Sequence, residues 1–229
     1  MDNLQKQMPF AALIFDHDGT LIDTETQDFR SCQVVFAEQG VTLTAEKWAE
    51  TVVGRFGGYD LIFDELVAEK GGDLTRDYLW TRLRASWRKN FDDSTLMPYV
   101  AELIPNLKSA GYRLAVATAS DAQWANRWLT QFALIDYFEV IATKDNVTNN
   151  KPAPDVYLYA AEQLAVQPEK CLVFEDSLAG VQAAKAAGMT VVAVPSPLTR
   201  SLDFSIADHV IDGLSPVRLS WLEKIAGIV

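Results

Sequence analysis

The apolar residues of this 229-residue chain gather in short runs that alternate with longer stretches of helical periodicity. A short apolar run bounded by polar or turn-forming residues is typical of a strand that is buried on both faces of a parallel sheet. The pattern therefore predicts a series of strands, of which the last is minor. These are Phe10–Phe15, Tyr112–Thr118, Phe138–Ala142, Cys171–Phe174, Thr190–Val194 and Asp208–Ile211.

Helical spacing of apolar residues fills the gaps between the later strands. Residues three and four positions apart share one face of a helix, so this spacing predicts helices that pack on the sheet. Pro105 lies inside the first of them and is expected to kink that helix or delay its start. Alternating strands and helices predict a parallel sheet covered on both faces. The predicted helices are Tyr99–Ala110, Asp121–Phe132, Pro154–Ala165, Ser177–Ala187 and Leu214–Ala226.

The stretch between the first two predicted strands has a purely helical pattern. It is almost a hundred residues long, from position 16 to position 111, whereas a connection between neighbouring strands needs far fewer. A threonine at position 75 could cap the last of its helices. The helices predicted in this stretch are Thr26–Gln39, Ala45–Val53, Tyr59–Lys70 and Thr75–Phe91.

Together these elements predict an α/β fold with a Rossmann-like, doubly wound parallel sheet. Residues 1–23 and 97–229 would form this core, and residues 24–96 would form an inserted all-helical domain. The two connections, near Ile22–Glu25 and near Asp92–Pro98, are expected to act as hinges.

Composition and charge narrow the range of partners. A hydrophobic fraction of 49% supports a well-filled core, and 31 acidic against 20 basic residues give a net charge of −11. Nucleic acids and anionic membrane surfaces both need a basic footprint, so neither is an expected partner. A small anionic substrate is compatible with this charge if its pocket is locally positive.

Cysteine usage and the absence of long apolar runs indicate the compartment. Cys32 and Cys171 are far apart, too few for a disulfide framework or a four-thiolate zinc site. No run approaches the length of a membrane span, and residues 1–9 lack the apolar centre of a signal peptide. We therefore expect a protein of the reducing cytoplasm.

The first predicted strand ends abruptly in two acids, Asp16 and Asp18, followed by Gly19. Ligands of open α/β sheets bind at the carboxyl ends of the strands, and glycine lets the backbone approach a ligand closely. Two carboxylates there repel each other unless a cation lies between them, and their hard oxygen ligands suit Mg²⁺. The alternative is that these acids only cap the turn or the next helix.

Polar groups also follow two later segments. Thr118 and Ser120 end the second core strand, where hydroxyl and backbone N–H groups can hold phosphate oxygens. Ser120 is equally suited to capping the next helix. Lys151 precedes a predicted helix in a proline-rich loop, where a fixed cation could neutralise an anion. A solvated surface lysine is the plain alternative.

The strand at Cys171–Phe174 again runs into acids, Glu175 and Asp176, followed by Ser177 as a plausible helix cap. Asp176 is the stronger candidate for a metal ligand and Glu175 the second, because neighbouring strand residues point to opposite faces. By the same alternation, His17 is expected to point away from the metal and to serve in packing.

The order of these motifs resembles the haloacid dehalogenase-like hydrolase superfamily. D-x-D-G-T at Asp16–Thr20 is followed by the strand-end Thr118, by K-P-x-P at Lys151–Pro154 and by E-D-S at Glu175–Ser177. The helical insertion resembles the type 1 cap of that superfamily. Within it, the chain is most similar to the β-phosphoglucomutase and sugar-phosphatase-like group.

The resemblance implies roles for the first and last motifs. Asp16 would attack phosphorus and become an aspartyl phosphate, and Asp18 would protonate the leaving alcohol and then activate water. Mg²⁺ would be held by Asp16, the backbone carbonyl of Asp18 and Asp176, with Glu175 as a further candidate ligand. Thr118 and Lys151 would bind the transferring phosphoryl group.

Substrate contacts are expected from Thr20, Ser120 and Arg55, the last of these in the inserted domain. The resemblance thus implies a Mg²⁺-dependent phosphohydrolase acting on a small phosphate monoester, a sugar phosphate being one candidate. Its partner would be a small phosphorylated metabolite. A monomer is expected, with a homodimer as the open alternative.

Three other functions compete with this reading. A phosphohexomutase of the β-phosphoglucomutase type is the nearest. By the resemblance, those mutases carry an arginine where this chain has Gly57 and a histidine where it has Asp28, and both differences weaken this alternative. A true haloacid dehalogenase would lack the second acid, Asp18. A non-enzymatic phosphoacceptor module would lack both the D-x-D-G-T motif and the large insertion.

Overall fold

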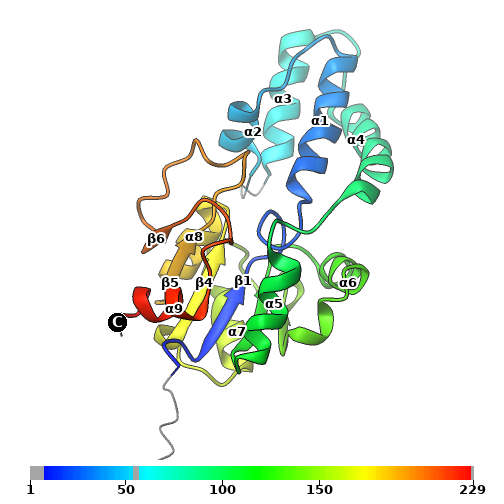
Figure 1. The fold of residues 1–229 in the computed structure, drawn as a ribbon. Helices are drawn as coiled ribbons and strands as arrows, with labels where there is room; N and C mark the ends of the chain where they lie inside the picture. Colours follow the sequence, from blue (N-terminus) through cyan, green and yellow to red (C-terminus); the bar gives the residue numbers. More distant parts are fainter. Residues whose placement is uncertain (1–7, 54–56, 228–229) are drawn as a thin grey trace, which may run out of the picture.

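The computed structural model describes residues 8–53 and 57–227. In these residues a six-stranded sheet, all of it parallel, has the strand order β3-β2-β1-β4-β5-β6 (Figure 1). Strand order reverses on the two sides of β1, which is the doubly wound arrangement predicted from the sequence. The strands are β1 (Ala12–Phe15), β2 (Arg113–Ala117), β3 (Val140–Ala142), β4 (Cys171–Glu175), β5 (Thr190–Ala193) and β6 (His209–Val210).

Helices cover both faces of the sheet because its central strand is apolar throughout. Leu13 and Phe15 belong to a cluster with α5, α6 and α9, whereas Ala12 and Ile14 belong to a cluster with α7 and α8. The α/β fold class is therefore confirmed. The helices of the core are α5 (Val100–Ser109), α6 (Ala122–Gln131), α7 (Asp155–Gln163), α8 (Leu178–Ala186) and α9 (Leu219–Ile225).

The α-helices between β1 and α5 form a block of their own, which lies above the sheet in Figure 1. This helical block has a separate apolar cluster that includes Phe29, Trp48, Phe63 and Leu83. Thr75 accepts a hydrogen bond from the backbone N–H of Tyr78 and caps the last helix, as the sequence predicted. Its helices are α1 (Glu25–Glu38), α2 (Ala45–Thr51), α3 (Gly58–Lys70) and α4 (Arg76–Asn90).

Two connections join the helical block to the core, and they run side by side. The Asp23 N–H donates to the carbonyl of Thr95 at 2.8 Å, and the Met97 N–H donates to the carbonyl of Leu21 at 2.9 Å. The second connection begins with the short 3-10 helix η1 (Phe91–Asp93). The division into domains at residues 24–96 remains a prediction from the sequence.

Two helix starts differ from the sequence prediction. Pro105 does not delay α5, which begins at Val100, because the missing N–H of Pro105 costs only one bond to the first helical turn. The last helix begins at Leu219 and not at Leu214. Pro216 accounts for this, since a proline disfavours helical geometry in the residue before it.

Cys32 and Cys171 are both buried and free. Cys32 lies in the cluster of the helical block and Cys171 in a cluster of the core, so the two cannot bridge without unfolding. Among the described residues, no helix combines the length and apolar character that crossing a membrane requires.

The stability of the core depends on β1. Replacing Leu13, which is 0% exposed in the central strand, by alanine should lower the free energy of unfolding by about 2–5 kcal/mol, because a cavity remains. The matched change Leu158→Ala on the surface of α7, where Leu158 is 40% exposed, should cost less than about 0.5 kcal/mol. Urea unfolding of both variants measures the difference, and equal losses would contradict this assignment of the core.

Candidate active site

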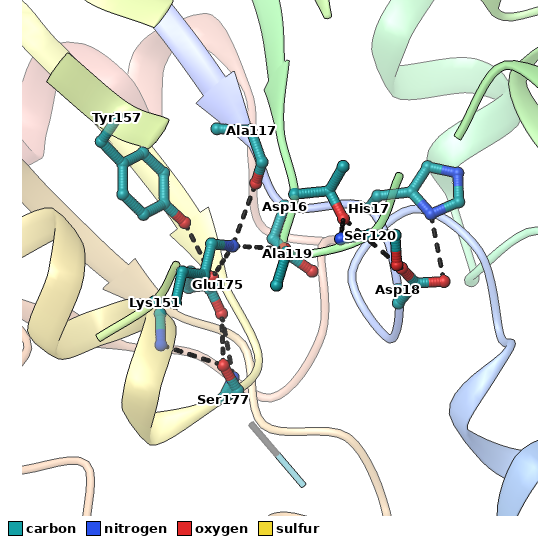
Figure 2. A network of polar contacts seen from close by, with 12 residues as sticks. Asp16, His17, Asp18, Ala117, Ala119, Ser120, Lys151, Tyr157, Glu175 and Ser177 are labelled. Atoms are coloured by element: carbon teal, nitrogen blue, oxygen red, sulfur yellow. Dashed lines mark hydrogen bonds and ion pairs between the residues drawn. The ribbon is translucent and has the colours of Figure 1, made fainter. Parts of the chain in front are cut away.

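The carboxyl ends of three neighbouring strands meet below the helical block. Asp16 follows β1, Thr118 follows β2, and Asp176 follows β4. A cavity of about 490 Å³ opens there, and both the core and the helical block contribute residues to its lining. The sheet therefore brings side chains that are far apart in the sequence to one place, which Figure 2 shows from close by.

Lys151 is the centre of the polar network. Its Nζ lies 2.6 Å from Oδ1 of Asp16, 2.6 Å from Oε1 of Glu175 and 3.0 Å from the carbonyl of Ala117 (Figure 2). The side chain is buried, so it is not a solvated surface lysine. Burial alone would lower the pKa of Lys151, but Asp16 and Glu175 raise that pKa above its ordinary value.

Both oxygens of Glu175 are occupied by hydrogen bonds. Besides Lys151, Oε1 accepts from the hydroxyl of Tyr157 at 2.7 Å, and Oε2 accepts from the N–H and hydroxyl of Ser177 at 3.0 and 3.1 Å. A Cβ built on Gly180 would lie 1.6 Å from Oε1, so this helical position has no room for a side chain. Sequence reasoning missed Tyr157 and Gly180, although a glycine inside a helix was a signal for close packing.

Asp176 differs from Glu175 in having an unsatisfied oxygen. The residue is buried, and within the part of the chain that the structure describes its Oδ2 has no hydrogen-bond partner. Asp16, Glu175 and Asp176 each offer an oxygen, and these oxygens lie within 4.8 Å of one another. Gly19, at a φ of 81°, passes so close that a Cβ there would lie 2.1 Å from Oδ2 of Asp176.

Asp18 is held by several donors on the other side of the site. Its Oδ1 accepts from the hydroxyl of Thr24 at 2.6 Å and from the indole N–H of Trp124 at 2.8 Å, and its Oδ2 accepts from the hydroxyl of Ser120 at 2.7 Å. Nδ1 of His17 lies 3.1 Å from Oδ1. Burial would raise the pKa of Asp18, but His17 and the donors from Thr24 and Trp124 lower it below its ordinary value.

Two of these partners differ from the sequence interpretation. His17 is buried as a packing residue would be, yet it also contacts the carboxylate of Asp18, which alternation along a strand did not predict. The turn at Asp18 is no longer regular strand, so alternation does not hold there. Trp124 was not identified at all, because only the packing of α6 brings it to Asp18.

The remaining predicted residues lie in different places. Thr118 lines the cavity, and its Oγ1 accepts from the N–H of Ser120 at 3.0 Å. Thr20 is buried, its hydroxyl has no hydrogen-bond partner among the described residues, and it is not among the described residues that line the cavity. Arg55 lies outside the described residues.

Two of the buried carboxylates, Asp16 and Asp176, have pKa values above their ordinary range. Burial, with smaller contributions from Glu175 and Asp18, raises the pKa of Asp16 from 3.8 to about 7 although Lys151 opposes the shift. Burial and the charges of Asp16 and Glu175 likewise raise the pKa of Asp176 well above its ordinary range. The cluster is therefore electrostatically unfavourable until positive charge is added.

This fold and site define an α/β enzyme whose cavity collects buried carboxylates and one buried lysine at the carboxyl edge of the sheet. The chain belongs to the haloacid dehalogenase-like hydrolases, since the sequence model of that family matches residues 13–194. The resemblance noted in the sequence is thereby confirmed.

Individual relatives agree with the family assignment. The chain is 39% identical to protein CbbY of Rhodobacter capsulatus, covering 95% of this chain and 100% of that protein. It is 32% identical to fructose-1-phosphate phosphatase YqaB of Escherichia coli, covering 81% of this chain and 96% of that one. The solved structure of CbbY from Rhodobacter sphaeroides with xylulose-(1,5)bisphosphate matches with a TM-score of 0.69 at 30% identity, covering 90% and 95% of the two chains.

The carboxylate cluster makes a prediction about stability. The pKa of Asp16 is about 7 in the folded state and 3.8 ordinarily. Between these two pH values the folded state keeps a proton on Asp16, whereas the unfolded state has released it. Stability in the presence of chelator should therefore fall as pH rises from about 4 to about 7. Melting temperatures should drop by at least about 2–4 °C, the effect of roughly 1 kcal/mol in a chain of this size.

Two variants separate this cluster from the general effect of net charge. Asp176→Asn removes a buried carboxyl group whose raised pKa adds to the pH dependence, and it should flatten that dependence. Asp73→Asn, at an exposed site in the turn before α4, should keep the slope of the unmodified chain. The same slope in all three proteins would contradict the electrostatic account.

Proposed function

We propose that this enzyme is a Mg²⁺-dependent phosphatase that hydrolyses a small phosphate monoester through an aspartyl phosphate on Asp16. The observation that carries the proposal is the arrangement around Asp16. Its Oδ1 is bound by Lys151, and a carboxylate oxygen of the buried Asp176 lies within 4.8 Å of one of Asp16. Among the described residues, Oδ2 of Asp176 has no hydrogen-bond partner. The phosphatase activity of the relative YqaB supports the same reaction class.

The donor set fits a divalent hard cation. Asp16, Glu175 and Asp176 bring three carboxylates against the single ammonium group of Lys151, so the cluster lacks positive charge. Among the described residues, Oδ2 of Asp176 has no hydrogen-bond partner, whereas both oxygens of Glu175 already accept hydrogen bonds. We therefore assign Mg²⁺ to Asp16, Asp176 and the backbone carbonyl of Asp18, with Glu175 as an orienting group. When bound, the ion would neutralise phosphoryl charge.

The chain's own residues can then carry out two displacements. A carboxylate oxygen of Asp16 attacks phosphorus while the bond from phosphorus to the leaving oxygen breaks, and Asp18 gives that oxygen a proton. Asp18 next takes a proton from a water that attacks the aspartyl phosphate, which releases phosphate and restores Asp16. Lys151 and the hydroxyl of Thr118 would hold phosphoryl oxygens, and both residues line the cavity.

Asp18 must change protonation state during this cycle. Its donors Thr24 and Trp124 hold it ionised, which suits the base that activates water. A phosphoryl group entering beside Asp18 adds negative charge and thereby favours the protonated form that the first step needs.

A phosphohexomutase is the second candidate, because it would use the same acids. It must hold a second phosphate on the far side of the cavity, for which an arginine is the natural group. By the resemblance, Gly57 stands at the position of that arginine, and among the described residues nothing lies within 4 Å of a Cβ built there. When β-glucose 1-phosphate is supplied with a hexose bisphosphate as primer, we expect no formation of glucose 6-phosphate that depends on the primer. Rapid isomerisation that requires the primer would favour the mutase.

Metal dependence is the first test of the proposal. Phosphate release from a panel of monoesters should require Mg²⁺, vanish in excess chelator and return when Mg²⁺ is restored. Ca²⁺ should inhibit, because its larger and looser coordination misaligns the attacking oxygen. Full turnover in chelator would overturn the proposed metal site.

The two leading acids should differ when each becomes an amide. Asp16→Asn should abolish turnover and covalent labelling, because an amide is not a competent nucleophile. Asp18→Asn should lower kcat by about 10²–10⁴-fold, the usual loss of general acid–base catalysis. Rapid-quench experiments with a phosphate-labelled ester that the enzyme hydrolyses measure the covalent labelling of both variants. An acid-stable label on Asp16→Asn would reject the assignment.

A further inference from the structure

The carboxylate of Asp18 is held unevenly by its neighbours. Its Oδ1 accepts hydrogen bonds from the hydroxyl of Thr24 at 2.6 Å and from the indole N–H of Trp124 at 2.8 Å. Nδ1 of His17 lies 3.1 Å from the same oxygen. An ionised carboxylate has about four acceptor sites, shared between its two oxygens, so Oδ1 is fully occupied by groups of the protein.

The other oxygen of Asp18 has fewer partners. Oδ2 accepts from the hydroxyl of Ser120 at 2.7 Å, whereas Oγ1 of Thr118 lies at 3.5 Å, too far for a strong hydrogen bond. In Figure 2 the dashed lines from His17 and from Ser120 reach different oxygens of Asp18. Asp18, Thr118 and Ser120 all line the cavity. Among the described residues, Oδ2 therefore keeps an acceptor site that a substrate or a water molecule can use.

Trp124 is itself fixed in place. Asp121 caps α6 by accepting from the backbone N–H of Trp124 at 2.8 Å, which sets the position of the first helical turn. The indole ring packs edge-to-face against Phe91 and Trp128, with 4.8 and 5.6 Å between the ring centroids. A donor that packing locks in one orientation can in turn lock the group that accepts from it.

We propose that Trp124 is a positioning residue for Asp18: its N–H anchors Oδ1, and Oδ2 carries out both proton transfers. The inference rests on the proposed phosphatase function and extends it to the atom that exchanges the proton. In the first displacement the O–H bond at Oδ2 breaks and the proton goes to the leaving oxygen, while the bond from that oxygen to phosphorus breaks. In the second, a water gives a proton to Oδ2 while the water oxygen bonds to phosphorus and the oxygen of Asp16 leaves.

Anchoring matters because the last torsion of an aspartate side chain is only weakly restricted. Hydrogen bonds therefore decide which oxygen faces the reacting group, and proton transfer needs that oxygen within hydrogen-bond reach. Without the N–H of Trp124, Oδ1 would lose one of its two close donors and the carboxylate would turn more freely. The hydroxyl of Ser120 can rotate, so it can serve Oδ2 both when that oxygen is ionised and when it carries the proton.

Two esters with different leaving groups test the role of Trp124 in rapid-quench experiments. An alkyl monoester that the enzyme hydrolyses has a leaving oxygen that needs a proton, whereas p-nitrophenyl phosphate releases a stabilised phenolate. Trp124→Phe, which keeps a ring but removes the N–H, should slow aspartyl phosphate formation from the alkyl ester by about three- to tenfold, the effect of one hydrogen bond. Formation from p-nitrophenyl phosphate should change by less than about twofold.

The second displacement gives an independent readout, because the aspartyl phosphate is the same whichever ester formed it. Its hydrolysis in Trp124→Phe should slow by about three- to tenfold with both esters. A purely structural role of Trp124 would slow aspartyl phosphate formation from the two esters alike, and that result would overturn the inference while leaving the phosphatase function intact. Failure to hydrolyse any ester of a broad panel would overturn the phosphatase function and this inference together.

Trp128 provides a matched control on the same helix. It is fully buried and contacts the ring of Trp124, but among the described residues its own indole N–H has no hydrogen-bond partner. Trp128→Phe removes the same atoms and should lower the melting temperature while leaving the ratio of the two esters unchanged. A shift of this ratio equal to that in Trp124→Phe would show that ring packing is responsible, and it would overturn the inference.

Two further proteins keep the test valid if Trp124→Phe does not fold. Benzothienylalanine at position 124 keeps the shape of the indole but lacks the N–H, and it should shift the ester ratio in the same direction. Thr24→Val removes the other close donor of Oδ1, and the hydroxyl of Thr24 is not needed to cap α1. This variant should shift the ratio likewise, and an unchanged ratio in either protein would overturn the anchoring of Oδ1.

Discussion

The burial of like charges at one edge of the sheet is the constraint on which this site depends. Asp16, Glu175 and Asp176 lie within a few ångströms of one another, and Lys151 is the cation placed among them. Such a cluster is unfavourable unless each charge is compensated, because few groups in the interior can replace water. Both oxygens of Glu175 accept hydrogen bonds inside the protein, but among the described residues Oδ2 of Asp176 has no hydrogen-bond partner. Three carboxylates at this edge of the sheet thus share the one ammonium group of Lys151.

The scaffold makes this arrangement possible because its central strand is fixed on all sides. β1 pairs with β2 and β4, and its side chains are packed from both faces of the sheet. The strand therefore cannot shift to relieve repulsion at its end. The surroundings of Glu175 are equally rigid. The hydroxyl of Tyr157 donates a hydrogen bond to Glu175, and Gly180, which has no side chain, leaves room for the Glu175 carboxylate.

Local patterns in the sequence predicted the sheet and the meeting of its polar strand ends, because both follow from rules that act over short distances. An apolar run followed by acids identifies Asp16 and Asp176 without knowledge of their neighbours. The contacts of Trp124 and Asp28 were not predictable in this way. They arise where helices from distant parts of the chain pack together, and no spacing rule brings α6 or α4 to a given carboxylate. The catalytic and binding roles themselves remain predictions.

The helical block and Asp18 are physically connected through aromatic rings. Tyr59 contacts Trp87 at 5.9 Å between ring centroids, Trp87 contacts Phe91 at 5.9 Å, and Phe91 contacts Trp124 at 4.8 Å. Trp124 in turn donates to Asp18. Phe91 lies in η1, on one of the two connections between block and core. Because ring contacts lose their attraction within a small displacement, the position of Trp124 depends on the packing of the helical block through Phe91. The packing of the block and the hydrogen bonding of Asp18 are for this reason not independent properties of the structure.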